Sequence, residues 1–324
     1  MDVAVFVQDG VADLGLTAVL EAFATANGLL DELEAAPDPW RLRLVGQSDQ
    51  VRTAHGFLAP TMPLAELPDS IGVLVVPAAR VLDADALIDM VSASANRSVL
   101  QLMTRAYESG VHLAAACTGT FYLAEAGVLD GAAATTSWWL GPAFRRRYPR
   151  IDLDEGRILC RAERRTTAGA SLSHIDLALS LIAATSPTLA ELTARYMVVG
   201  DRRPQLDSSI PEVIARRDSL VAAFERWVRD HVAEQFRIGD AAQQLGVTER
   251  TLQRATQAEI GMSPRDFVHE VRLERATQLL RTTALTIDAI SVKVGYLNAG
   301  TLRGLFRRRR GRSIAEVRAS RLSW

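Results

Sequence analysis

The chain has 324 residues, of which 48% are apolar and 23% are charged. These proportions match an ordinary globular protein and exclude a disordered, collagenous or coiled-coil chain. No apolar run approaches the roughly 20 residues that cross a bilayer, and no basic segment precedes the first apolar run, so we expect neither a membrane helix nor a secretory signal. Two cysteines are too few for a disulfide framework or a Cys-rich zinc site. We expect a cytoplasmic protein without a metal or a cofactor.

The net charge of -1 conceals an acidic part and a basic part. Counting Asp, Glu, Arg and Lys, residues 1–210 carry -8 and residues 211–324 carry +7. A polar, proline-flanked segment at 201–215 is predicted to be a linker. We therefore expect one domain over 1–200 and a second over 216–324, each with its own partner.

Residues 1–199 alternate short apolar runs with helical stretches, which predicts a layered α/β domain. The runs are rich in β-branched residues, as in strands that are buried on both faces of a parallel sheet. The expected strands are Val3–Val7, Leu42–Gly46, Val73–Pro77, Val111–Ala116 and Ala133–Thr136, with Arg157–Cys160 and Thr166–Ala168 as a hairpin. The expected helices are Leu16–Ala26, Ala84–Ser94, Ser98–Ser109, Thr118–Ala126, Trp138–Tyr148 and Ser173–Ala184.

Residues 212–324 are expected to be all-helical, and they contain an internal repeat. The two copies are offset by 49 to 50 residues, and each has the size of a helix-turn-helix unit. The first copy contains Leu245-Gly246-Val247, Thr251-Leu252 and Gly261-Met262-Ser263, which recur as Val294-Gly295-Tyr296, Thr301-Leu302 and Gly311-Arg312-Ser313. The predicted N-terminal helix caps are Thr248, Ser263, Thr286 and Asn298.

The second helix of each copy presents side chains that can read DNA bases from the major groove. The first copy presents Arg250 and Arg254. The second copy has Gly300 and Gly304 at these positions, so we expect it to discriminate bases less and to lean on phosphate contacts. The predicted DNA contacts are Thr248, Arg250, Gln253, Arg254, Asn298, Thr301, Arg303, Arg307 and Arg308, and the whole run Arg307–Arg310 is expected to meet phosphates.

These basic helices have two other interpretations. They could be solvated faces, but two aligned copies in a positively charged half favour nucleic acid. A membrane surface would need a large apolar face opposite the charges, and the apolar residues here are needed inside the helical units. Residues 216–320 moreover resemble the DNA-binding domain of the AraC/XylS family, on the segments Ile238–Arg254, Val271–Leu280 and Ile287–Phe306.

The resemblance implies two helix-turn-helix units on a rigid linker helix, entering successive major grooves of double-stranded DNA at an operator or promoter. RNA polymerase is a further partner that such a regulator can have. The departure from the family lies at Gly300 and Gly304, where its members commonly carry a fuller aromatic or polar set.

Cys117 follows one expected strand and precedes an expected helix. This placement is typical of a nucleophile elbow, and the amides of Thr118 and Gly119 would stabilise a thiolate or bind an anionic group. A buried structural cysteine is the alternative. A redox role is a variant that needs a lowered thiol pKa.

Residues 1–199 resemble the ThiJ/PfpI-like domain, which is related to class I glutamine amidotransferases and implies a flavodoxin-like parallel sheet. A ThiJ/PfpI-like domain followed by an AraC-type domain is the order of the GlxA group of regulators. The matching segments are Val3–Gly10, Leu20–Phe23, Gly72–Ala78, Ala116–Phe121, Leu123–Gly131, Ala134–Thr136 and Thr167–Ala170.

The family's usual acid and histidine have no counterpart at the matching positions. Gly15 stands at the position of the acid, with Asp13 two residues away, and Ser137 stands where the family frequently has histidine. His112 begins the strand of Cys117, roughly 16 Å along it. His174 stays open as a residue that lines the pocket, and His55 lies elsewhere in the chain.

We therefore expect no catalysis and a pocket that binds an unidentified small-molecule effector. Its predicted lining is Gly15, Pro77, Ala78, Ala79, Cys117, Thr118, Gly119, Ser137 and Trp138. The expected protein is an effector-responsive transcriptional regulator that forms a homodimer through its first domain. The alternatives are a cysteine enzyme of amidase, hydratase or glyoxalase type tethered to DNA, and a regulator without an effector.

Overall fold

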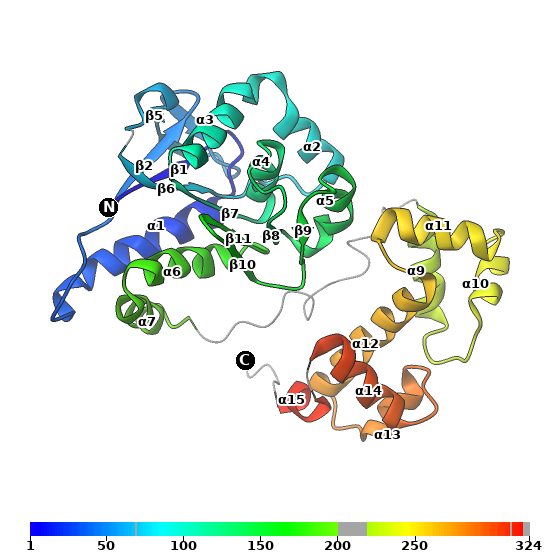
Figure 1. The fold of residues 1–324 in the computed structure, drawn as a ribbon. Helices are drawn as coiled ribbons and strands as arrows, with labels where there is room; N and C mark the ends of the chain where they lie inside the picture. The colour runs from blue at the N-terminus through cyan, green and yellow to red at the C-terminus, as the bar shows by residue number, and fades with distance from the viewer. Residues whose placement is uncertain (69, 200–218, 312, 320–324) are drawn as a thin grey trace. The chain divides into compact units, whose positions relative to one another are not determined.

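A computed structural model describes residues 1–68, 70–199, 219–311 and 313–319. The chain divides into two compact units, Met1–Leu206 and Asp207–Trp324 (Figure 1). The predicted linker at 201–215 lies outside the described residues. Within the described ranges, no helix is both long and apolar enough to cross a membrane.

A seven-stranded sheet forms the centre of the first unit, in the order β10-β11-β7-β6-β1-β2-β5. Neighbouring strands are parallel except for β10 and β11, which form the predicted antiparallel hairpin. The strands are β1 (Asp2–Phe6), β2 (Arg41–Gly46), β5 (Met62–Pro63), β6 (Ile71–Val76), β7 (His112–Ala116), β10 (Leu159–Ala162) and β11 (Arg165–Ala168).

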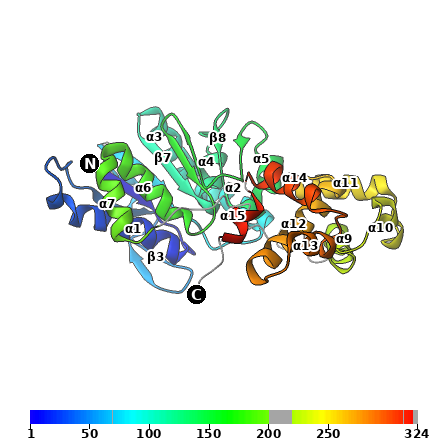
Figure 2. The ribbon, with the colours of Figure 1, turned by 90° about the horizontal axis from the view of Figure 1, so that it is seen from below.

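Helices cover both faces of this sheet (Figure 2). Successive side chains of a strand point to opposite faces, so Val3 and Val5 of β1 pack in one hydrophobic core and Ala4 and Phe6 in the other. Helices α1 (Asp13–Gly28), α6 (Ser173–Thr185) and α7 (Pro187–Tyr196) close the first of these cores. The other is closed by α2 (Ala84–Ser92), α3 (Arg97–Glu108), α4 (Thr120–Glu125) and α5 (Gly141–Arg147).

Besides small shifts of element ends, as at α1 and β10, three predicted elements are shortened or divided. The strand expected at Ala133–Thr136 is the two-residue β8 (Ala133–Ala134), paired with β9 (Asp152–Leu153). The pairing stops there because the N–H of Thr135 donates to the side-chain Oγ1 of Thr167 and not to a strand carbonyl. The helix expected at Trp138–Tyr148 is a 3-10 turn, Trp138–Leu140, followed by α5. The helix expected at Thr118–Ala126 likewise begins with a 3-10 turn, Cys117–Gly119. The hairpin of β3 (Gln50–Arg52) and β4 (Leu58–Pro60) was not predicted.

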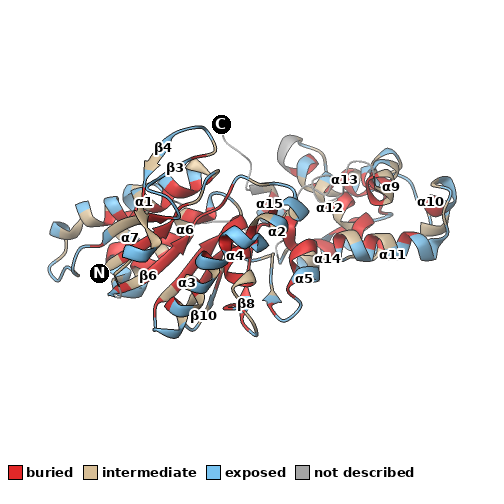
Figure 3. Cartoon of the chain, turned by 90° about the horizontal axis from the view of Figure 1, so that it is seen from above, coloured by how far each residue is buried: buried red, intermediate tan, exposed pale blue. Residues whose placement is uncertain are grey.

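The described part of the second unit is helical, as predicted. Its helices are α9 (Leu220–Asp230), α10 (Ile238–Gln244), α11 (Glu249–Ile260), α12 (Pro264–Thr282), α13 (Ile287–Lys293), α14 (Ala299–Arg310) and α15 (Ile314–Ala319). Figure 3 shows buried faces turned inward and exposed outer faces on these helices. The side chains of all four predicted caps accept backbone N–H groups, at 3.0 to 3.2 Å: Thr248, Ser263, Thr286 and Asn298.

Candidate DNA interface and cysteine elbow

The first candidate interface is the outer face of α11. Leu252 is fully buried in the core of its unit, and this orientation leaves Arg250, Gln253 and Arg254 exposed. Neither arginine forms an ion pair within the described residues. Thr248 is exposed too, but its Oγ1 accepts the N–H of Thr251 at 3.1 Å and so holds the start of the helix.

The second candidate interface is the outer face of α14, where Thr301 and Arg303 are exposed. Asn298 is exposed and its Oδ1 accepts the N–H of Thr301 at 3.0 Å, which leaves its amide NH₂ for other partners. A Cβ at Gly304 would lie 3.3 Å from Nη1 of Arg308, so the glycine gives the arginine room to lie along the helix.

The arginine run at the end of α14 divides into two pairs. Arg307 and Arg308 are exposed. Arg309 binds both Asp266 and Glu270 of α12, and Arg310 binds Glu270 at 2.6 Å. That the whole run meets phosphates stays a prediction, and for these last two arginines it has a competitor, because carboxylates about 40 residues away in the sequence already pair with them.

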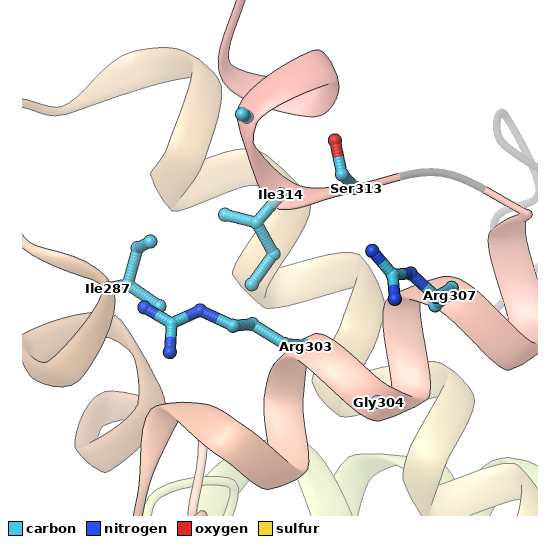
Figure 4. A pocket seen from close by; sticks show the side chains of 7 residues that line it. Ile287, Arg303, Gly304, Arg307, Ser313 and Ile314 are labelled. Carbon is cyan, nitrogen blue, oxygen red and sulfur yellow. The ribbon is translucent and has the colours of Figure 1, made fainter.

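A hollow of about 310 Å³ opens beside Gly304, between α14 and the start of α15. Figure 4 shows Arg303 and Arg307 on opposite sides of it, with Ile287 and Ile314 lining its wall. Two outward guanidinium groups of this kind can each contact a backbone phosphate. Their placement favours the phosphate role that the sequence predicts for this helix.

Cys117 occupies a sharp turn between β7 and α4, as the sequence predicts. Its φ is +58°, a strained value for a residue with a Cβ. The hydroxyl of Thr136 donates to the Cys117 carbonyl at 2.7 Å, and Ser137 Oγ lies 2.8 Å from the cysteine Sγ. These contacts hold the elbow in place at the carboxyl end of the sheet.

The thiol of Cys117 is poorly suited to nucleophilic attack. Burial raises its pKa above the ordinary value of 9.0, and the hydrogen bonds from Ser137 and Thr118 only partly oppose this effect. Since the thiolate is the reactive species, the protonated thiol is a weak nucleophile at neutral pH. The lowered pKa that a redox role needs is not found.

The structure brings together the predicted lining residues that follow β6 and those of the elbow, which follows β7. Thr118 Oγ1 donates to Ala79 O at 2.7 Å. A Cβ at Gly119 would lie 2.2 Å from Val76 O and 2.7 Å from Pro77 O, so the elbow packs directly on the end of β6. All nine predicted lining residues are buried, including Ser137 and Trp138. Ligand binding here stays a prediction.

His174 is fully buried beside α1. Its Nδ1 donates to Ser171 O at 2.7 Å, and its Nε2 accepts the N–H of Ala78 at 3.1 Å. A Cβ at Gly15 would lie 2.6 Å from Nε2, so the imidazole fills the space that a side chain at position 15 would need. With both nitrogens engaged, His174 holds β6 and α6 together and does not serve Cys117 as a base.

Two further histidines have partners that the sequence did not predict. Asp13 accepts hydrogen bonds from the N–H and Nδ1 of His55, the latter at 2.7 Å, and so ties the β3–β4 hairpin to the start of α1. Nε2 of His112 lies 2.9 Å from Thr166 Oγ1, near the far end of β7. In the described ranges, no group of three or more His, Cys, Asp or Glu side chains is placed to hold a metal ion.

The burial of His174 predicts acid sensitivity of the first unit. Burial lowers the pKa of His174 from 6.5 to about 4. Between these two pH values the imidazole is therefore protonated in the unfolded chain and neutral in the folded chain. The free energy of unfolding is therefore expected to fall as the pH drops from 6.5 towards 4, by up to about 3 kcal/mol from this residue. Urea unfolding at several pH values measures this, with His174→Gln as the comparison. Equal pH slopes for the two proteins would contradict the prediction.

An α/β domain with a cysteine elbow, followed by two helix-turn-helix units, defines a regulator that joins a DNA-binding domain to a second domain. A helix-turn-helix domain family matches residues 241–320. The HTH-type transcriptional regulator CdhR of Pseudomonas aeruginosa strain PAO1 is 32% identical over 227 residues, which cover 68% of this chain and 67% of CdhR. The chain belongs to this family of AraC-type transcriptional regulators.

Other relatives agree with this assignment. The transcriptional regulator GlxA of Rhizobium meliloti is 24% identical over 225 residues, 68% of each chain. GbdR of P. aeruginosa strain UCBPP-PA14 is 23% identical over 209 residues, which span 63% of this chain and only 57% of GbdR. A ThiJ/PfpI family protein from Pseudomonas syringae superposes with a TM-score of 0.51 at 21% identity, over 63% of this chain and 76% of its own, which supports the fold of the first unit.

Proposed function

We propose that this regulator binds duplex DNA through α11 and α14 and adjusts transcription in response to a small molecule bound by its first unit. The observation that carries the proposal is the orientation of the two second helices. Each buries a leucine, Leu252 or Leu302, and exposes the polar residues around it. With DNA as the partner, the proposed location is the cytoplasm.

Selection of bound sequences from a pool of random duplexes, using the full chain, tests DNA binding directly. We expect a motif of two blocks about one helical turn apart, sharper in the block read by α11. Genome-wide mapping of bound sites would then place the motif beside regulated genes. Recovery of no preferred sequence would overturn the proposal.

Arg254→Ala should lose affinity and specificity together. A bidentate arginine contact with a base contributes about 1–3 kcal/mol of discrimination. The variant is therefore expected to bind the selected duplex about 5- to 150-fold more weakly and to tolerate substitutions at one position of the motif. Fluorescence anisotropy on the motif and its single-base variants measures both effects. Arg105→Ala, an exposed arginine of α3 in the other unit, is the control.

Arg308→Ala should weaken binding to all duplexes alike. Loss of one phosphate contact releases about one counterion fewer, so the slope of log K against log salt should become shallower by roughly one. Affinities for the selected and a scrambled duplex between 50 and 200 mM salt test this. If Arg308→Ala relaxed specificity as Arg254→Ala does, the assignment of α14 to phosphate contacts would be wrong.

The effector proposal rests on the first unit keeping the elbow without the means for catalysis. The Cys117 thiol is protonated, both nitrogens of His174 are engaged, and position 15 is glycine. A thermal-shift screen of small polar and anionic metabolites tests for an effector, and a stabilising hit that also changes DNA affinity supports it. Turnover of amides or aldehydes that Cys117→Ala abolishes would instead support the enzyme alternative.

We further propose that the first unit forms a homodimer through α1 and the β3–β4 hairpin. Leu14 is 51% exposed and Phe57 is 70% exposed, and the Asp13–His55 hydrogen bonds hold their two segments together. Analytical ultracentrifugation of the wild type and Phe57→Ser tests this. We expect a dimer that the substitution weakens, and a monomeric wild type would contradict the proposal.

A further inference from the structure

The long helix α12 passes through two separate hydrophobic cores. Its first half contributes Phe267, Val268 and Val271 to the core of the first helix-turn-helix unit. Its second half contributes Leu273, Ala276 and Leu280 to the core of the second helix-turn-helix unit. The two cores share no residue. Arg272 stands where α12 leaves one core for the other, and it is only 8% exposed.

On one side, Arg272 holds the loop that leads into the first helix-turn-helix unit. Its Nη2 donates to the carbonyl of Glu234 at 2.6 Å. Its guanidinium carbon lies 5.1 Å from the ring centroid of Phe236, within the range of a cation–π contact. Both partners belong to the loop between α9 and α10.

On the other side, Arg272 packs against the turn of the second helix-turn-helix unit. Its guanidinium carbon lies 5.3 Å from the ring centroid of Tyr296. The turn approaches so closely that a Cβ at Gly295 would lie 2.7 Å from that guanidinium and 2.5 Å from Val232 O of the α9–α10 loop. One buried guanidinium therefore contacts both helix-turn-helix units at once.

The chemistry of this junction demands an arginine. The planar guanidinium stacks on aromatic rings while its N–H groups donate in the plane, which a lysine ammonium cannot reproduce. Methionine would fill a similar volume but would leave the Glu234 carbonyl without this donor and would attract neither ring as a cation does. Replacement of Arg272 by methionine should therefore loosen one helix-turn-helix unit relative to the other while both hydrophobic cores stay filled.

We propose that Arg272 is the positioning residue that fixes the separation and relative rotation of α11 and α14, and thereby the spacing of the two DNA blocks that the protein accepts. The inference rests on the proposed function for its DNA consequence. Two linked binding sites reinforce each other only when their separation matches that of their targets. A loose junction should thus reduce binding to a two-block duplex far more than binding to either block.

The first experiment measures the geometry without DNA. Spin labels at Gln257→Cys and Arg307→Cys of the full chain report the distance between α11 and α14; the native cysteines, Cys117 and Cys160, are both buried. We expect one narrow distance distribution, broadened or shifted by Arg272→Met. The matched control is Arg275→Met, an exposed arginine of the same helix, which should leave the distribution unchanged. An unchanged distribution in Arg272→Met would overturn the proposal.

The second experiment measures the consequence on DNA. The probes are the two-block duplex selected from the random pool, the same duplex with one extra base pair between the blocks, and a duplex with one block. Arg272→Met is expected to lose about tenfold in affinity for the first probe and less than about twofold for the last, and so to prefer the first spacing less. Arg272→Lys, which keeps the charge, should lie between.

The outcomes separate the two proposals. If the wild type selects no motif, the proposed DNA binding fails, while the spin-label distances still judge the role of Arg272. If Arg272→Met loses equal affinity for one-block and two-block duplexes, the residue is merely structural and the inference fails. Circular dichroism checks that the variants fold, and Tyr296→Phe, which keeps the ring beside Arg272, should retain the wild-type spacing preference.

Discussion

Gly119→Ala is expected to destabilise the α/β unit by about 3 kcal/mol or more. The added Cβ would lie 2.2 Å from Val76 O and 2.7 Å from Pro77 O, distances that no side-chain adjustment can relieve because both atoms belong to the backbone at the end of β6. Either the elbow must lift away from the strand or the strand must bend. Overpacking of this kind costs about 1–3 kcal/mol, and occasionally more, and a backbone obstacle places this site at the upper end.

Urea unfolding of the full chain, followed by tryptophan fluorescence, measures the loss. Gly28→Ala is the matched control, since a Cβ there meets nothing within 4 Å and the glycine ends helix α1 with an ordinary φ. That control should be neutral or slightly stabilising. A Gly119→Ala protein as stable as the Gly28→Ala protein would show that the elbow does not pack on β6 as described.

Gly295→Ala should be far more harmful than Gly246→Ala, although the two glycines occupy equivalent turns of the repeat. Both have positive φ, +75° and +68°, so alanine pays about 1–2 kcal/mol of strain at either position. Only at Gly295 does the Cβ also approach Val232 O and the Arg272 guanidinium. We expect about 1 kcal/mol for Gly246→Ala and about 3 kcal/mol or more for Gly295→Ala.

Thermal unfolding and binding to the two-block duplex test this pair together. The expected result is a normal or mildly reduced affinity for Gly246→Ala and a strongly reduced one for Gly295→Ala. Equal effects of the two substitutions would mean that the turn of the second helix-turn-helix unit is as open as that of the first. The described contact between the two helix-turn-helix units would then be wrong.

The parts of the fold that local chemistry determines could be predicted from the sequence. Buried strands, the cysteine elbow and the four helix caps each depend on residues that are neighbours in the chain. Helix α7 is absent from the predicted elements, although Ser186-Pro187 repeats the cap pattern of Ser263-Pro264 and is a local signal for it. The β3–β4 hairpin has a weaker signal, because its strands are only three residues long, although Gly56 in the connecting turn has a φ of +89°.

The side-chain contacts between distant segments could not be predicted. The Asp13–His55 pair joins residues 42 apart, and Arg309 meets Glu270 across 39 positions. Periodicity places such residues on a helix or in a loop, but it does not say which other segment covers them. For this reason His174 and the last two arginines of α14 acquired their roles only from the tertiary structure.

The difference between the two recognition helices has a consequence for the promoters that such a regulator can serve. α11 presents long polar side chains, whereas α14 has glycine at positions 300 and 304. A regulator whose two recognition helices differ in base specificity binds an asymmetric site in one orientation, because only one of its two placements is favourable. Mutations in the half-site bound by α14 would then change affinity little. A new promoter would come under control of the regulator by acquiring the half-site that α11 binds.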